Sequence, residues 1–362
     1  MLTTVKSSIE IIPFQEKERW NAIVHSFKDY DIYYLNDYLK AFQIHGDGNP
    51  LLFYYESEEL KGISAVMKRD IASFNMLGSI IPKNEYFDLI TPYGYGGFLF
   101  DGILSQTNLQ NFEKLYSDLL KQENIVSEFV RFHPLLKNAD NLKFMFEVQS
   151  LGKTISMDLK SLEIIWQNIT SKNRNAIRKA EKYGVEIFHG KNHDLFKEFA
   201  RIYNSTMDHD NANTYYYFSD DFYTSIHNDL LDNYEMFYAV YQSKIIAMSI
   251  ILFANNKMHY HLSGSCFEYR NLAPTNLLLY KAACWGYSQG FHTFHLGGGL
   301  GCEDDNLYKF KEAFNRNSDN RFSIGKRVIN RDMYDYFIKK RVEIDSKFDL
   351  NNSYFPLYRY IN

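Results

Sequence analysis

The chain of 362 residues is predicted to form two tandem α/β units with mixed α+β sheets, packed together. Its length exceeds the usual size of one domain, and its 45% hydrophobic content can supply two cores. The segment LKGISAVM at 60–67 has a weak counterpart, SKIIAMSI, at 243–250, and each belongs to an expected hairpin. Because this offset of roughly 180 residues is far longer than a solenoid repeat, we interpret it as a duplicated α/β unit.

The first half alternates strand and helix patterns. Leu35, Leu39 and Phe42 recur at helical spacing and predict a helix over 32–44. The polar segment ESEELK between two apolar runs predicts a hairpin. The expected elements are strands at 9–12, 51–56, 62–68 and 125–132, and helices from residue 16, over 32–44 and over 109–121.

The second half opens with an apolar stripe at helical spacing that begins at Leu162, and Gly184 is a residue typical of helix C-caps. These features predict one helix from 162 to 184. The expected elements after it are a strand at 185–188, helices at 194–207 and 219–231, and hairpin strands at 235–241 and 244–253. No Pro/Ser-rich linker separates the halves, which favours tight packing of the two units.

The segment 291–314, FHTFHLGGGLGCEDDNLYKFKEAF, combines a strand, a glycine-rich bend and a helix. Alternating aromatic and polar residues predict the strand, and glycine lets a ligand approach the backbone closely. Asp305 or Asn306 is a candidate cap for the helix, whose apolar stripe ends at Phe314. Lys311 lies beside that stripe, so this place is suited to holding a carbonyl group while it is attacked.

Composition argues against several classes of protein. The formal net charge of −4 argues against a protein that coats nucleic acid, and the sequence has no GxSxG or P-loop motif. Three cysteines without CxxC spacing argue against a disulfide framework and structural zinc. The histidine pairs 259/261 and 292/295 have no carboxylate or cysteine at ligand spacing, so no metal is expected.

Three segments resemble FemABX-type peptidyl and aminoacyl transferases and the FemAB-related proteins of polysaccharide clusters, which share the GNAT fold. They are LGGG with its acidic loop and LYKFK, NRNAIRKAEKYGV at 173–185, and YHLSGSCFEYRNLAPTNLLLYKAACWGYSQG at 260–290. The resemblance implies two tandem GNAT-like acyltransferase domains. It places the first at 1–153 plus 320–362 and the second, with the LGGG–LYKFK segment, at 154–319.

The donor loop departs from the pattern of simple GNAT enzymes, which hold the CoA pyrophosphate on backbone N–H groups at a helix N-terminus. A literal motif at 43–48, QIHGDG, ends a predicted helix, so we interpret it as a C-cap and turn. The loop at 270–275 has the right context but carries Ala273 in place of glycine, and Pro274 has no N–H. This favours aminoacyl-tRNA, the donor that the resemblance implies, with acyl-CoA or an acyl carrier protein as the alternative and no tightly bound cofactor. The donor-binding candidates are Arg174, Arg178 and Arg270, although a solvated helix face also explains the first two.

The resemblance assigns catalysis to Phe310 and Lys311. A fixed positive charge beside the developing oxyanion lowers a barrier by about 3 kcal/mol; the alternative is a lysine whose stem covers the core. The substrate-binding candidates are Lys40, Tyr93, Tyr95, Tyr216, Tyr260, Asn276, Gly298 and Gly299. The segment 211–214 lacks the arginine that the family has there, which argues against a UDP-linked precursor. Three histidines are open alternatives for the general base: His259, His261 and His295.

These features predict a transferase that moves an aminoacyl or acyl group from an activated ester to an amine of a cell-envelope precursor. The acceptor, a small or lipid-linked molecule, is expected to be a peptidoglycan peptide or an amino sugar of a surface polysaccharide. The alternatives are an acyl-CoA- or acyl-carrier-dependent N-acyltransferase and a non-catalytic module that binds a glycan or peptide. The N-terminus lacks the apolar run of a signal peptide, and the longest apolar run, 245–254, is too short to span a bilayer. We therefore expect a cytoplasmic protein without a transmembrane segment that associates peripherally with the membrane.

Overall fold

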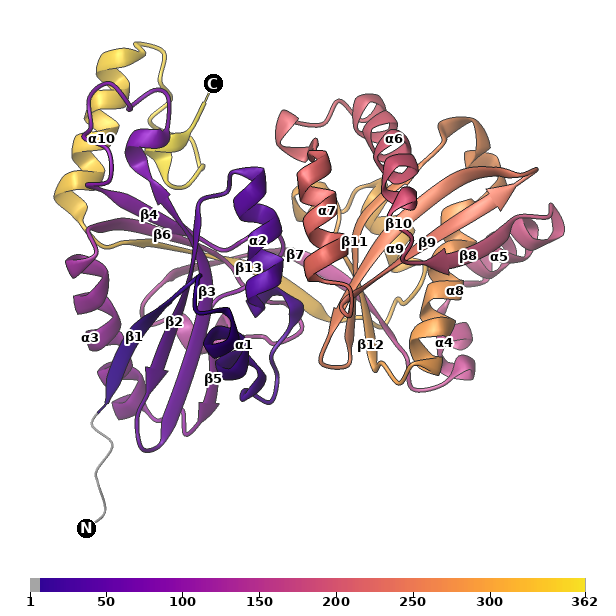
Figure 1. Cartoon of the computed structure of the whole chain (residues 1–362), viewed down its shortest axis with the longest axis horizontal. Coiled ribbons are helices and arrows are strands. Elements are labelled where there is room, and N and C mark those ends of the chain that lie inside the picture. The colour runs from indigo at the N-terminus through magenta and orange to yellow at the C-terminus, as the bar shows by residue number, and fades with distance from the viewer. Residues whose placement is uncertain (1–6, 362) are drawn as a thin grey trace. The chain divides into compact units, whose positions relative to one another are not determined.

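A computed structural model of the chain describes residues 7–361 (Figure 1). The chain divides into two compact units, of which the first comprises Met1–Ser150 and Phe322–Asn362 and the second comprises Leu151–Arg321. The chain thus leaves the first unit once and later returns to it. The chain passes from one unit to the other after residues 150 and 321, whereas the expected boundaries follow residues 153 and 319.

The first unit is built on a mixed sheet with the strand order β1-β2-β3-β4-β6-β13. Neighbouring strands are antiparallel except for β4 and β6, which are parallel. β5 is antiparallel to β3 and shares one edge of it with β4. The strands are β1 (Ser8–Pro13), β2 (Asn49–Glu56), β3 (Leu60–Asp70), β4 (Phe87–Ile90), β5 (Leu99–Gly102), β6 (Ile125–Arg131) and β13 (Asn320–Val328). The expected hairpin is confirmed as β2 and β3.

The helices of the first unit cover this sheet. The longest helix follows its N-cap residue Ser105, whose hydroxyl accepts from the N–H of Asn108. Phe112 and Tyr116 of this helix are buried against β2. The expected helix at 32–44 is two elements, because Leu35 is extended and separates a short 3-10 turn from the helix that follows. The helices are α1 (Lys17–His25), α2 (Asn36–His45), α3 (Gln106–Gln122) and α10 (Arg331–Ile344), with 3-10 turns η1 (Ile32–Tyr34), η2 (Ile71–Ser73), η3 (Asp140–Leu142) and η7 (Leu357–Arg359).

The second unit has its own mixed sheet, with the strand order β7-β12-β11-β10-β9-β8. Only β11 and β12 are parallel. The strands are β7 (Glu147–Asp158), β8 (Glu186–Gly190), β9 (Tyr234–Tyr241), β10 (Lys244–Ala254), β11 (Lys257–Ser265) and β12 (Thr293–Gly297). The second expected hairpin is confirmed as β9 and β10.

Helices lie on both faces of this second sheet. α4, α5 and α8 share one apolar core with the sheet, which includes Ile177, Leu278 and Phe294, while α6 packs on β10 and β11. The single helix expected from 162 to 184 is wrong: Ile169 is extended and Thr170 caps a new helix by accepting from the N–H of Asn173. The helices are α4 (Leu162–Asn168), α5 (Ser171–Lys182), α6 (Asp194–His209), α7 (Asp220–Asp229), α8 (Pro274–Ser288) and α9 (Asn306–Glu312), with 3-10 turns η4 (Thr214–Tyr216), η5 (Phe267–Leu272) and η6 (Leu300–Cys302).

The two sheets repeat one plan. Read from β1 and from β8, each sheet has three antiparallel pairings, then one parallel pairing, then one antiparallel pairing. β3 and β10 hold the same place, and they contain the two similar sequence segments. The two-domain fold is therefore a duplication, in which the sixth strand comes from late in the chain in one unit and from before the other strands in the other. Within residues 7–361, no helix combines the length and the apolar character needed to cross a membrane.

Candidate active site

The glycine bend after β12 is held in one shape by a carboxylate. Gly297 has a positive φ of 79°, and a Cβ on Gly299 would collide with the carbonyl of Glu303 and the carboxylate of Asp305. Asp305 accepts from the N–H groups of Leu300, at 2.9 Å, and Tyr308, at 2.7 Å. It thereby closes the bend and caps α9, as the sequence predicted. Burial raises the pKa of this carboxyl, but the N–H donors outweigh it, so the net shift is downward.

Lys311 is buried at the base of this bend. Its side chain projects from α9 and is only 8% exposed. Nζ donates to the carbonyl of Gly298 at 2.6 Å and lies 5.9 Å from the centre of the Tyr260 ring. A cation that is removed from water in this way acts on neighbouring charge more strongly than an exposed one. The side chain therefore does not extend into solvent.

Tyr260 contributes a hydroxyl group to the same region. Burial raises its pKa, and hydrogen bonds with Ser263 and Ser249 act in the opposite direction. The two serine hydroxyls lie 2.9 Å apart, between β10 and β11. Lys311, Tyr260 and this serine pair together bring a cation and three hydroxyls to one side of the second unit.

The parallel pair β11 and β12 has a short ladder that ends close to the bend. It comprises three residue pairs, of which the last is His259 with His295, whereas β11 continues to Ser265. His295 Nε2 is 2.9 Å from the Thr154 hydroxyl. Burial and the nearby His259 lower the pKa of His261 to about 3. His261 is thus a weaker base than an ordinary imidazole.

Phe310 and Asn276, two other predicted site residues, have structural contacts of their own. Phe310 is half-buried and meets Phe314 edge to face at 5.6 Å. Asn276, in the first turn of α8, donates to the side chain of Asn173 at 2.7 Å. This bond joins the N-termini of α8 and α5, two places where backbone N–H groups favour anions.

The donor loop before α8 presents few N–H groups. Ala273 is in the left-handed region, with φ of 54°, and its N–H donates to Arg270 O. Pro274 occupies the first helical position, where it supplies no donor. The side chain of Arg270 lies over the ring of Phe267, 3.9 Å from its centre, at an exposed position.

The two arginines of α5 differ in their contacts. Arg174 donates to the carbonyls of Trp166, at 3.2 Å, and Ile169, at 2.6 Å, and so stabilises the break between α4 and α5. Arg178 is exposed and lies 5.1 Å from the centre of the Trp166 ring. Arg178 is therefore the more accessible cation of the two.

The predicted acceptor residues lie in both units. In the first unit, Tyr93 stacks on Phe42 of α2, the helix that also carries Lys40, with ring centres 5.5 Å apart. Tyr95 contacts Tyr33, with ring centres 5.5 Å apart. In the second unit, Tyr216 lies in η4 and meets the neighbouring Tyr215 edge to face, at 5.5 Å.

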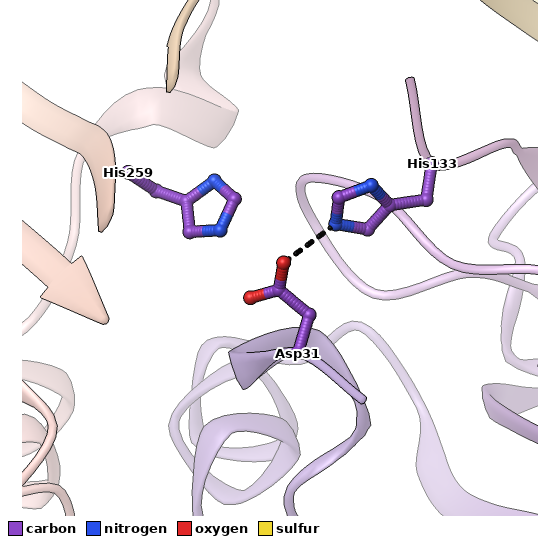
Figure 2. Close-up of side chains that lie close together, drawn as sticks. All are labelled: Asp31, His133 and His259. Carbon is purple, nitrogen blue, oxygen red and sulfur yellow. Dashed lines mark hydrogen bonds and ion pairs between the residues drawn. The ribbon is translucent and has the colours of Figure 1, made fainter. Parts of the chain in front are cut away.

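A buried polar network in the first unit was missed by the sequence analysis. Figure 2 shows the carboxylate of Asp31 and the imidazole of His133, which are 2.9 Å apart and fully buried. The backbone N–H of His133 donates to Asn138 Oδ1 at 2.9 Å. Asn138 Nδ2 in turn donates to the carbonyls of Gly96 and Phe98. These residues belong to no sequence motif. The only available signal was that Asp31 and His133 are polar residues in largely apolar segments of the sequence.

Comparisons with known proteins agree with this architecture. Residues 168–311 match the family model described as acetyltransferase (GNAT) domain. The crystal structure of FemX superposes with a TM-score of 0.66 at 15% identity, over 91% of this chain and 99% of that chain. The C-terminal domain (DUF2156) of a putative lysylphosphatidylglycerol synthetase from Agrobacterium fabrum gives 0.55 at 12% identity, over 86% and 92%.

A tandem GNAT protein from the clavulanic acid biosynthesis pathway gives a TM-score of 0.51 at 8% identity, over 90% of this chain and 99% of that chain. Among curated proteins, no sequence match was found. The expected resemblance to FemABX-type transferases is confirmed at the level of the fold, and the match to the acetyltransferase (GNAT) domain model lies within the second unit.

Proposed function

We propose that the protein transfers an aminoacyl or acyl group from an activated ester to an amine of a cell-envelope precursor. The observation that carries this proposal is the buried ammonium of Lys311, held 2.6 Å from the carbonyl of Gly298 inside a GNAT domain. A solvated surface lysine would have no such position. The glycine bend gives the reacting group access to the backbone beside this charge.

In the proposed reaction the acceptor amine attacks the carbonyl carbon of the ester. The new C–N bond forms, the carbonyl oxygen becomes an oxyanion, and the ammonium of Lys311 stabilises it. The C–O bond to the donor then breaks. The nitrogen loses one proton and the leaving oxygen gains one, so no oxidant or reductant is required. Holding the two substrates together supplies much of the rate enhancement.

Aminoacyl-tRNA is the donor that we favour. The loop before α8 offers a poor pyrophosphate cradle, because Pro274 has no N–H and that of Ala273 is already bonded. The exposed surface nearby alternates arginines with aromatic rings, as in Arg178 over Trp166 and Arg270 over Phe267. Such a surface suits phosphates and unstacked bases of single-stranded nucleic acid.

An acyl-CoA- or acyl-carrier-dependent N-acyltransferase is the second candidate. The acetyltransferase family match over 168–311 favours it, as does the convergence of two helix N-termini at the Asn173–Asn276 contact. Binding of CoA to the N–H groups of Thr275 and Asn276 in a crystal soak would favour this candidate over tRNA.

For the acceptor we propose a peptidoglycan peptide or an amino sugar of a surface polysaccharide, met in the cytoplasm or at the inner membrane surface. Tyr93, Tyr95 and Lys40 remain the proposed contacts within the first unit, and Tyr216 is a separate candidate in the second unit. Phenol groups combine apolar area with one hydrogen-bonding tip, which suits peptides and sugars.

The test is mass spectrometry of candidate precursors incubated with charged tRNA or with acyl-CoA. We expect one donor pool to yield a product, and Lys311→Ala to lower kcat by a factor of about 100 to 1,000. Lys309→Ala is the matched control, because Lys309 is an exposed lysine of the same helix, and its activity should be unchanged. Near-normal activity of Lys311→Ala would remove the catalytic assignment. Absence of transfer from every donor, with a glycan or peptide still bound, would support the non-catalytic module instead.

A further inference from the structure

Two histidines meet at one end of the helix pair α6 and α7. His193 is the exposed N-cap residue of α6, and His227 lies half-buried in the last turn of α7. Their rings meet edge to face, with centroids 5.1 Å apart. The helices themselves are joined by aromatic contacts such as Phe196 with Tyr223. The pair therefore has a fixed frame, although its members are far apart in the sequence.

Hydrogen bonds around Tyr234 fix the orientation of the His227 ring. The Tyr234 hydroxyl donates to the carbonyl of Lys191 at 3.3 Å, and a carbonyl can only accept. Nδ1 of His227 lies 2.7 Å from the same hydroxyl, and this hydrogen bond holds the ring whichever of the two atoms donates. When Nε2 binds a metal, Nδ1 carries the proton and can donate to this hydroxyl. A ring whose second nitrogen is held in this way is the usual arrangement of a histidine metal ligand.

The charges around the pair also suit a metal ligand. Burial, together with the nearby His193, lowers the pKa of His227, so the ring is neutral at neutral pH. The Lys191 ammonium donates to Leu231 O at 2.6 Å and lies 4.0 Å from the carboxylate of Glu235. This carboxylate offsets the positive charge of Lys191, whose Nζ lies 5.9 Å from the centre of the Tyr234 ring.

We propose that His193 and His227 bind a divalent transition-metal ion such as Zn²⁺, with one nitrogen each and water in the remaining positions. With Zn–N bonds of about 2.0–2.1 Å and ring centres roughly 1.1 Å further on, two imidazoles on a tetrahedral ion lie about 5 Å apart. The observed separation of 5.1 Å matches this spacing. The bound ion joins the start of α6 to the end of α7 and so stiffens the helix pair.

The experiment measures Zn²⁺ affinity of the untagged, chelator-treated chain by competition with a chromophoric chelator. Wild type is expected to bind zinc, and His193→Ala or His227→Ala each to weaken the binding at least tenfold. Tyr234→Phe retains both ligands but frees Nδ1 of His227, so it should weaken binding by about tenfold through loss of orientation. Thermal melts without metal establish that each variant folds.

His209→Ala is the matched control, because His209 is an exposed histidine at the other end of α6. It should bind zinc with the affinity of wild type. Electron paramagnetic resonance of the Cu²⁺ form should show two coupled nitrogens, which the double variant of His193 and His227 lacks. Zinc affinity of wild-type strength in that double variant, or no binding by the wild type, would overturn the proposal. Neither result affects the transfer reaction proposed above.

Discussion

The two units contain the same parallel strand pair, but its end differs between them. In the first unit the pairing continues past β4, since the N–H of Gly96 still donates to the carbonyl of Arg131 at 2.8 Å. In the second unit the ladder stops at His259 and His295, while β11 runs on to Ser265. Backbone groups between two strands can serve a ligand only where the strands separate. The comparison therefore supports placing the proposed donor site in the second unit.

The segment that follows the fifth strand of each sheet, β6 in one unit and β12 in the other, shows the same contrast. In the first unit the buried amide of Asn138 closes this segment on the carbonyls of Gly96 and Phe98. In the second unit the buried ammonium of Lys311 closes it on Gly298. A neutral amide satisfied by the backbone has a structural role, whereas a buried cation next to bare backbone can act on a reacting group. Duplication followed by specialisation explains how one fold holds both.

The largest expected effect concerns the closed first unit. Glu128 of β6 is buried, and burial raises the pKa of its carboxyl to about 7, opposed by Arg327 and a hydrogen bond from Tyr116. The folded state therefore keeps a proton that the unfolded chain, with a pKa near 4.5, has lost. Stability should fall as the pH rises from about 4.5 to about 7 and stay lower above, by up to about 3 kcal/mol.

Glu128→Gln removes this titration while it preserves the acceptor for Tyr116. Urea unfolding at pH 5 and pH 8 should show a smaller loss of stability in the variant than in wild type. The control is Glu58→Gln, at an exposed position, which should retain the wild-type slope. An identical slope in Glu128→Gln would contradict the assignment.

The next prediction tests the bend of the second unit. Gly299→Ala forces the backbone away from Glu303 and Asp305, and so displaces the carbonyl of Gly298 from Lys311. A misplacement of about 1 Å lowers kcat by roughly a hundredfold. Gly190→Ala is the control, because its Cβ meets nothing within 4 Å. Equal turnover of the two variants, measured by product mass spectrometry, would show that the bend shape is irrelevant to the reaction.

A smaller effect is expected from opening the closed unit. Arg131 donates to the carbonyls of Thr91 at 3.0 Å and Pro92 at 3.1 Å. Arg131→Ala should lower the free energy of unfolding by about 2 kcal/mol, because hydrogen bonds from a charged donor are lost. Donor affinity should not change, since the donor site is assigned to the other unit. A weaker donor complex in this variant would place a donor contact in the first unit.

The smallest effect separates the two arginines of α5. Arg178→Ala should weaken a tRNA donor a few-fold, with a shallower salt dependence and unchanged stability. Arg174→Ala should instead lower the melting temperature, because its carbonyl contacts at the helix break are lost. Filter binding at several salt concentrations and thermal melts measure both. The reverse pattern would assign the donor contact to Arg174.

Sequence patterns predicted the elements whose periodicity is strong. The two hairpins, the strand before the triple glycine and the cap at Asp305 all follow from local rules that the structure obeys. The expected 162–184 helix failed at Thr170, because helical spacing of apolar residues continued across a break that one side-chain hydrogen bond determines.

The buried networks could not be predicted in the same way. Asp31 and His133 come together only through tertiary folding, and neither lies in a motif. Arg174 donates to a carbonyl at the break between α4 and α5. The sequence showed only that Arg174 belongs to a basic helix, so this contact could not be predicted. The sequence placed Lys311 beside an apolar stripe, and the structure shows that this side chain is buried.

The return of the chain to its first unit has a consequence for biosynthesis. β13 pairs with β6 at positions such as Lys326 and Phe129, so one strand of the N-terminal sheet leaves the ribosome only after the whole second unit. During translation β6 waits with an unpaired edge while the whole second unit emerges, and that unit can fold first. A chain stopped before residue 320 should therefore yield a folded second unit joined to an aggregation-prone first unit. Pairing of β13 with β6 covers the exposed strand edge and completes the first unit.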